Sequence, residues 1–159
     1  MGLLLIISPL PAIAAPRVQA NTAAKELIKT SEGLCLKSYL CPADKLTIGY
    51  GHTGPDVKAG QMIDQAKADE LLEQDLKKFN DGVTRLVRPS TTENQFSALV
   101  SFAYNLGLDK LRTSTLLKKH NSGDTVGAYL EFPKWVWGGG KRLPGLVKRR
   151  QLEANLYKT

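Results

Sequence analysis

Apolar residues recur at helical spacing along most of the chain. The first such stretch begins at Asn21 or Thr22, either of which can cap a helix, and ends at Gly33. Its apolar positions are Ala24, Leu27 and Ile28. A longer helix is predicted from Asp64, with a buried stripe made of Leu72, Leu76, Phe79 and Val83. This long helix is expected to join two lobes.

Thr92 and Gln95 have the spacing of a capping box, which predicts a third helix. This helix is apolar enough to form the core of the larger lobe, through Phe96, Leu99, Val100, Ala103 and Leu106. Shorter helices are expected from Ser114 to near Gly123 and from Asp124 to Pro133. Residues 135–140 then form a turn, and Pro144 opens the last helix.

The segment between the first two helices follows a different pattern. Pro42 and Asp44 break regular structure, and residues 46–48 then form a short strand, so a helix end, a loop and a hairpin are expected. Glycine-rich residues 49–60 connect the hairpin to the long helix. The fold class is therefore α+β and mostly α, with a small β-hairpin lobe joined by a long helix to a helical lobe.

Charge and composition limit the partners. The 159 residues fit one domain, and a net charge of +7 predicts attraction to a polyanion. Nucleic acid is disfavoured because no helix-turn-helix, zinc or aromatic-platform signature accompanies the charge, so an anionic cell-wall polymer fits better. The densest basic patch, expected to be a solvated face that can bind the wall, is Lys141, Arg142, Lys148, Arg149 and Arg150. No metal or other cofactor is expected, since His52 and His120 lie far apart without a second ligand nearby.

The N-terminus has the character of an export segment. Residues 1–15 form an apolar run that is too short and too interrupted by proline for a comfortable membrane span. Small residues suited to cleavage occur at residues 12–14 and 18–20, although the usual leading Lys or Arg is missing. We therefore assign residues 1–20 to export and residues 21–159 to the functional domain, and expect delivery to the periplasm or cell wall.

The segment from Ser31 to Thr53 gathers the candidate chemistry. Its spacing, Glu32-x8-Cys41-x5-Thr47 followed by Gly-x-Gly-His, resembles the active-site signature Glu-x8-Asp-x5-Thr of the T-even-type phage lysozymes, glycoside hydrolase family 24. Residues 95–107 and 145–153 resemble the central and closing helices of that family. The resemblance implies a lysozyme-like two-lobed fold and a monomeric endolysin. Its implied activity is cleavage of the β-1,4 bond between N-acetylmuramic acid and N-acetylglucosamine in peptidoglycan, leading to host lysis.

The resemblance also implies roles for single residues. Glu32 would be the general acid, and Thr47 would hold the water. Cys41 stands where most of the family has aspartate, as it does in some signal-anchor-release endolysins, and would either attack the anomeric carbon or activate water. Asp44 lies three residues too late to fill this position. Likeness to the anchor-release group suggests a transient inner-membrane association through residues 3–15.

Several further residues are candidates for the site, and most of them have two interpretations. His52 is either a packed partner of Asp75, which is favoured, or a second base, and Asn105 is a sugar contact or a helix cap. Arg150 is a candidate substrate contact. Trp135 and Trp137 stack on sugar or, more commonly, pack against the core. The alternatives to a lysozyme are an amidase or peptidase using Cys41 and His52, and an inactive wall-binding module.

Cys35 and Cys41 are the only cysteines, six residues apart. A disulfide between them requires the intervening segment to bend back, and spacing alone does not align the side chains. The resemblance to anchor-release endolysins implies a regulatory bond that blocks the Cys41 sulfur until it is reduced. Two unpaired thiols remain the alternative.

Overall fold

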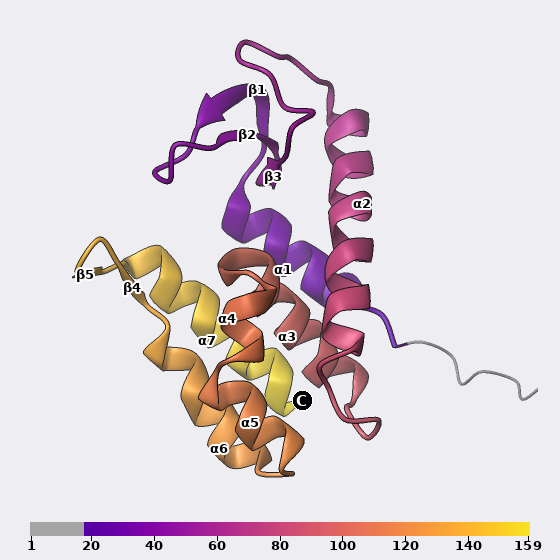
Figure 1. Cartoon of the computed structure of the whole chain (residues 1–159), viewed down its shortest axis with the longest axis vertical. Coiled ribbons are helices and arrows are strands. Elements are labelled where there is room, and N and C mark those ends of the chain that lie inside the picture. Colours follow the sequence, from indigo (N-terminus) through magenta and orange to yellow (C-terminus); the bar gives the residue numbers. More distant parts are fainter. Residues whose placement is uncertain (1–17) are drawn as a thin grey trace, which may run out of the picture.

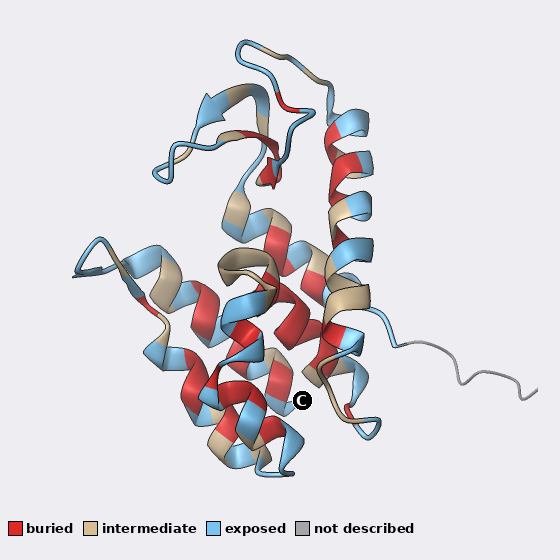
Figure 2. Ribbon diagram, viewed as in Figure 1, coloured by how far each residue is buried: buried red, intermediate tan, exposed pale blue. Residues whose placement is uncertain are grey.

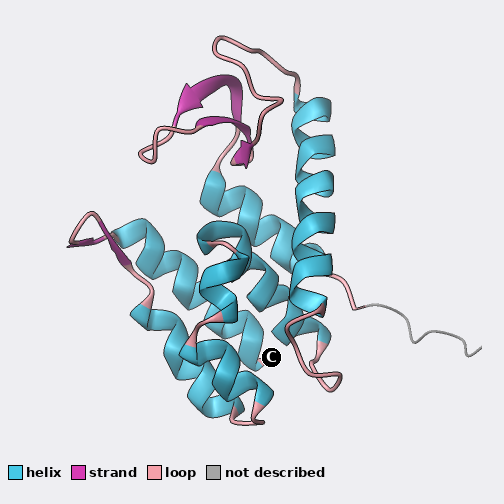
Figure 3. Ribbon diagram, in the orientation of Figure 1, coloured by secondary structure: helices cyan, strands magenta, loops and turns pink. Residues whose placement is uncertain are grey.

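The computed structural model describes residues 18–159, so the expected export segment lies largely outside the described residues. Figure 3 shows a group of helices with a small sheet at one end. The helices are α1 (Thr22–Glu32), α2 (Gln65–Thr84), α3 (Glu93–Leu106), α4 (Leu108–Arg112), α5 (Thr115–Asn121), α6 (Thr125–Glu131), the 3₁₀ helix η1 (Phe132–Lys134) and α7 (Pro144–Lys158). The strands are β1 (Cys35–Leu40), β2 (Leu46–Gly49), β3 (His52–Thr53), β4 (Trp137–Gly138) and β5 (Lys141–Arg142).

The small lobe is an antiparallel sheet in the order β1-β2-β3. In its register, Tyr39 lies opposite Thr47 and Ile48 lies opposite His52. A separate small core fills the space between the sheet and the first turns of α2, and consists of the buried residues Ile48, Val57 and Leu71. Figure 1 shows this lobe beside the N-terminal half of α2.

Helix α2 connects the small lobe to the large one, as predicted. Asp64 caps it by accepting a hydrogen bond from the Lys67 backbone N–H at 2.8 Å. Of the predicted stripe, Leu72, Leu76 and Val83 are buried, whereas Phe79 is partly buried against the large core.

Helix α3 lies at the centre of the large lobe. The predicted capping box is present between Thr92 and Gln95, and every residue from Phe96 to Ala103 is buried. Figure 2 shows the buried residues gathering along α3 and the inward faces of its neighbours, including α7. Two lobes with two cores confirm the predicted α+β, mostly α architecture.

The structure differs from the prediction in two short elements. Helix α4 was not expected, and the predicted turn at residues 135–140 is part of a hairpin, since it contains β4 and is followed directly by β5. Gly139 and Gly140 have φ values of 57° and 76°, which suit a two-residue type I′ turn that only glycine and a few polar residues adopt readily. Within residues 18–159, no helix is long and apolar enough to cross a membrane.

Candidate active site

Glu32 is the last residue of α1, where the chain leaves the helix for the small lobe. Gly33 ends the helix with φ 73°, and its N–H donates to the Lys29 carbonyl at 2.9 Å. The Glu32 carboxylate accepts a hydrogen bond from Arg149 Nη1 of α7 at 2.6 Å. A Cβ at Gly51 would lie 2.8 Å from Glu32 Oε2, so the glycine leaves room for this carboxylate. Arg149 of the large lobe thus holds Glu32, and the missing side chain at Gly51 of the small lobe leaves room for it.

Arg149 belongs to a buried ionic cluster on α7. Its Nε lies 3.3 Å from Glu153 Oε1, and Arg150 Nε lies 2.9 Å from Glu153 Oε2. Ser101 also donates to Glu153 Oε1, at 2.8 Å. Arg150 is fully buried and its guanidinium lies 5.2 Å from the centre of the Phe102 ring. Removing one partner from such a cluster leaves an uncompensated buried charge, which is costly.

The prediction that Arg149 and Arg150 belong to an exposed basic face is therefore wrong. They are 4% and 0% exposed, because Glu153 and Glu32 supply the opposite charges that let them enter the interior. Lys141, Arg142 and Lys148, by contrast, are exposed as expected.

The two candidate substrate contacts touch each other. Arg150 Nη2 donates to Asn105 Oδ1 at 2.7 Å, and the cap of α3 is Gly107 rather than Asn105. Because Arg150 is 0% exposed, its contact with substrate would have to pass through Asn105, which is partly exposed.

Cys41 directly follows β1 and interacts with the side chain of Thr47 in β2, which itself lies opposite Tyr39. The hairpin that joins β1 and β2 is closed by Cys41 N–H donating to the Lys45 carbonyl and Asp44 N–H donating to the Cys41 carbonyl, both at 2.9 Å. Hydrogen bonds from the Lys45 and Ala43 backbone, and then from the Thr47 side chain, lower the pKa of the Cys41 thiol. Thr47 has one hydroxyl proton, which it donates either to the Cys41 sulfur or to the Lys45 carbonyl 3.1 Å away.

Asp44 does not take the place of Cys41. It has a positive φ of 55° at the hairpin turn, a conformation that Asp tolerates better than most residues. Asp44 therefore forms the turn that follows Cys41.

His52 is paired on both ring nitrogens. Nδ1 lies 2.8 Å from Asp75 Oδ2, the partner expected from the sequence, and Nε2 lies 3.0 Å from Asp56 Oδ2. Burial disfavours the charged ring, but the hydrogen bonds with Asp75 and Asp56 outweigh it and raise the pKa of His52. With both nitrogens occupied by carboxylates, His52 is poorly placed to serve Cys41 as a base, which disfavours the amidase interpretation.

The two cysteines are free and both are partly exposed. Strand β1 runs from Cys35 to Leu40, directly before Cys41. Six residues of extended strand span roughly 20 Å, whereas a disulfide needs Cα atoms within about 7 Å. This conformation therefore keeps the Cys41 sulfur available.

Sequence reasoning missed the residues that hold the site from behind. Tyr104 of α3 donates a hydrogen bond to the Tyr50 carbonyl at 2.6 Å and so ties the large lobe to the loop before β3. The ion pairing of Arg149 could have been predicted from Glu153, because Glu153 lies four residues after Arg149 and three after Arg150 on the same helix.

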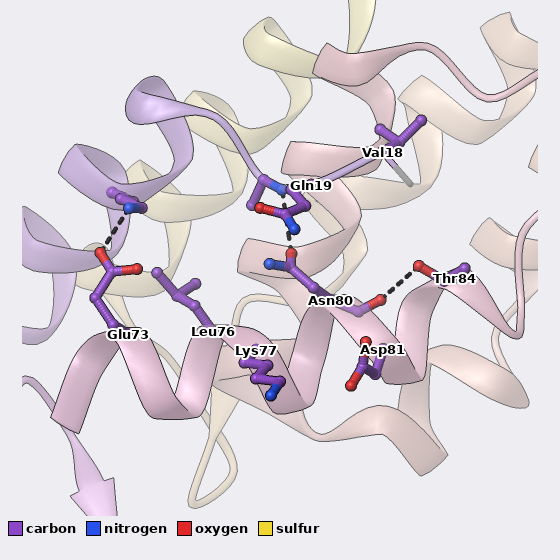
Figure 4. Close-up of a pocket in the computed structure, with 10 residues that line it drawn as sticks. Val18, Gln19, Glu73, Leu76, Lys77, Asn80, Asp81 and Thr84 are labelled. Atoms are coloured by element: carbon purple, nitrogen blue, oxygen red, sulfur yellow. Dashed lines mark hydrogen bonds and ion pairs between the residues drawn. The ribbon is translucent and has the colours of Figure 1, made fainter. Parts of the chain in front are cut away.

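A cavity of about 370 Å³ lies elsewhere, between residues 18–20 and α2. Figure 4 shows its polar walls, with Glu73, Asn80 and Thr84 each making a hydrogen bond or an ion pair. None of Glu32, Cys41 and Thr47 lines it. Over residues 18–159, no group of His, Cys, Asp or Glu is arranged to hold a metal ion.

Several known proteins are similar to this chain in sequence or in fold. The endolysin of Bacillus phage PZA is 48% identical over 142 residues, which cover 88% of this chain and 55% of that protein. The SAR-endolysin of bacteriophage PS119 is 38% identical over 125 residues, covering 79% of this chain and 75% of that protein. The solved muramidase domain of SpmX from Asticaccaulis excentricus is 35% identical with a TM-score of 0.83, and the match covers 90% of this chain and 99% of that domain.

The chain spans about half the length of the Bacillus phage endolysins it matches. The family model described as Phage lysozyme matches residues 29–153, which include Glu32, Cys41, Thr47 and the α7 cluster. On this match and on the shared fold, the chain belongs to the phage lysozyme family.

Proposed function

We propose that the chain is an endolysin that hydrolyses the β-1,4 bond between N-acetylmuramic acid and N-acetylglucosamine in bacterial peptidoglycan. The observations that carry the proposal are Glu32, which accepts a hydrogen bond from Arg149 at 2.6 Å, and the contact between Cys41 and Thr47 on the hairpin that joins β1 and β2. Family membership and the muramidase and endolysin relatives support the same substrate.

In this mechanism Glu32 donates its proton to the glycosidic oxygen as the bond from that oxygen to the anomeric carbon breaks. Cys41 acts from the other side of the sugar. In one route the thiolate attacks the anomeric carbon, and water later replaces the sulfur while Glu32 takes the water proton. In the other route the thiolate takes a proton from a water held by Thr47, and that water attacks directly. Mass spectrometry of a quenched reaction separates the routes, because only the first adds a glycosyl fragment to Cys41.

The test of the proposal is Glu32→Gln on purified peptidoglycan. Loss of the donated proton is expected to lower the release of new reducing ends by at least about 100-fold, the usual contribution of a general acid. Glu26→Gln is the matched control, because it removes one exposed carboxylate from the same helix and is expected to keep full activity. Release of new amines instead of reducing ends, or wild-type rates for Glu32→Gln, would reject the lysozyme.

We further infer that residues 1–20 carry the chain across the inner membrane and that residues 3–15 associate with it transiently. Support comes from the apolar sequence of this segment and from the SAR-endolysin relatives. Fusing residues 1–20 to a reporter enzyme that is active only after export is expected to give activity, and Ile6→Arg is expected to abolish it. The exported domain is expected to act as a monomer, which light scattering after size exclusion measures.

A further inference from the structure

The outer side of α7 carries a groove that is separate from Glu32. Two cavities of about 300 and 480 Å³ share Arg142, Val147 and Gln151 in their walls and so adjoin each other. An α-helix turns by about 100° per residue, so Val147 and Gln151 each lie about 200° from Arg149 around the helix axis. Because Arg149 faces Glu32, the groove and the active site lie on opposite sides of the same helix.

The groove combines apolar walls with amide and positively charged groups. Pro133 and Pro144 contribute apolar surface, Gln151 offers a side-chain amide, and exposed Arg142 and Lys148 contribute positive charge. No Asp or Glu lines either cavity. A ligand for this groove should therefore carry both hydroxyl or amide groups and negative charge.

An exposed tryptophan projects from the hairpin beside the groove. Trp137 lies directly opposite Arg142 in the β4–β5 register, which places both side chains on one face of the hairpin. It is 64% exposed, and no ring contact of Trp137 is found among the described residues. Trp135, in contrast, packs edge-on against Phe102 with ring centres 5.3 Å apart. The expectation that both tryptophans pack in the core is thus confirmed for Trp135 and wrong for Trp137.

The hairpin is fixed at its base. Val136 is buried, and its carbonyl accepts a hydrogen bond from Leu143 N–H at 2.9 Å just before α7 begins. Figure 1 shows the hairpin projecting from the large lobe at the start of α7. The backbone that carries Trp137 is therefore held before a ligand binds, which lowers the entropy cost of binding.

We propose that the groove and Trp137 form a second, non-catalytic binding site for a peptidoglycan strand, an identification of the ligand that rests on the proposed function. Trp137 stacks on a sugar ring and Gln151 hydrogen-bonds to hydroxyl or acetamido groups. Arg142 and Lys148 pair with the carboxylates of the peptide stems. The site keeps the enzyme on the wall while another strand occupies the catalytic side of α7.

Binding to sedimented peptidoglycan tests the proposal in the Glu32→Gln protein, which leaves the ligand uncut. Trp137→Ala and the double variant Arg142→Gln/Lys148→Gln are each expected to weaken binding about tenfold, as expected for a central aromatic or charged contact. The matched control Lys110→Gln/Arg112→Gln removes two exposed charges from α4, away from the groove, and is expected to bind within twofold of the parent. Equal losses in the two double variants would mean general charge attraction and would overturn the site.

Two further measurements separate binding from catalysis. Peptidoglycan fragments added to the Glu32→Gln protein are expected to shift the emission of Trp137 to shorter wavelength, and the shift should vanish in Trp137→Phe. In the otherwise active enzyme, Trp137→Ala should hydrolyse a short soluble fragment within twofold of the wild-type rate. An unchanged emission, or wild-type wall binding by Trp137→Ala, overturns the second site. The two proposals fail separately: activity of Glu32→Gln rejects the lysozyme assignment, whereas wall binding by Trp137→Ala at the level of its parent rejects the second site.

Discussion

Buried His120 is expected to make the protein less stable in acid. The Thr91 hydroxyl donates its only proton to the Arg88 carbonyl at 2.7 Å, so it must accept the hydrogen bond from His120 Nε2 at 2.8 Å. Nδ1 then accepts from the Tyr157 hydroxyl at 2.6 Å. The neutral ring is satisfied at both nitrogens, whereas a second proton on Nδ1 would displace the hydrogen bond that the Tyr157 hydroxyl donates there.

The size of the effect follows from the titration of His120. Burial, with a smaller contribution from the positive charge of Arg88, lowers the pKa of His120 to about 4 from 6.5. In the unfolded chain the ring binds its proton below 6.5, while in the folded protein it stays neutral down to about 4. Stability is therefore lost as the pH falls through this window, by about 3 kcal/mol in total.

Urea unfolding of wild type and His120→Gln between pH 7 and pH 4 measures this loss. At pH 7 the variant is expected to be less stable, because it loses buried packing and hydrogen bonds. The difference in free energy of unfolding should shrink by about 3 kcal/mol by pH 4, since glutamine does not titrate. A difference that stays constant across this range would refute the reasoning.

His52→Gln provides a control of opposite sign. The pKa of His52 is raised in the folded protein by Asp75 and Asp56, against the effect of burial. Its contribution to stability should therefore be complete below 6.5 and be lost as the pH rises through the folded value. The stability difference for His52→Gln should thus shrink toward alkaline pH, where that for His120→Gln is constant.

The remaining predictions concern the hairpin between β1 and β2. Cys41→Asp should keep substantial lytic activity but lose the increase in activity toward alkaline pH that thiol ionisation gives. Cys41→Ser should be far less active. Equal activity of Cys41→Ser and wild type would remove the thiol from the mechanism. Because the pKa of the Cys41 thiol is lowered, the wild-type rise should occur at a pH below that of an ordinary thiol, measured in a pH series of reducing-end release. Because extended β1 separates Cys35 from Cys41, the folded protein is expected to keep two free thiols, with an intact mass that reductant does not change. A gain of two protons on reduction together with a change in lysis rate would instead support a regulatory disulfide.

Local signals in the sequence predicted the helices well. Asp64, Thr92, Ser114 and Asp124 each accept a hydrogen bond from a backbone N–H three residues later, an interaction that depends only on neighbouring residues. Helix α4 was missed because five residues are too few for a periodic pattern to stand out.

The hairpin β4–β5 was missed because its strands have only two residues each and its three glycines indicate a turn in any context. Whether Trp137 packs or projects depends on this register, which pairs it with exposed Arg142 rather than with a core residue. The sequence therefore predicted the same packing role for both tryptophans, whereas in the structure Trp135 packs against the core and Trp137 is exposed.

The burial of Arg149 and Arg150 shows why charge patterns alone mislead at the site. A run of three basic residues is usually solvated, and here Lys148 is exposed while the next two are not. Glu153 lies one turn along α7 and pairs with both arginines, but the second carboxylate that pairs with Arg149, that of Glu32, is 117 residues away in the chain. Only the packing of α1 against α7 brings that carboxylate near, so the contact that holds the proposed acid depends on tertiary structure. It also makes the position of Glu32 depend on α7, whose far end is held by the hydrogen bond between Tyr157 and His120.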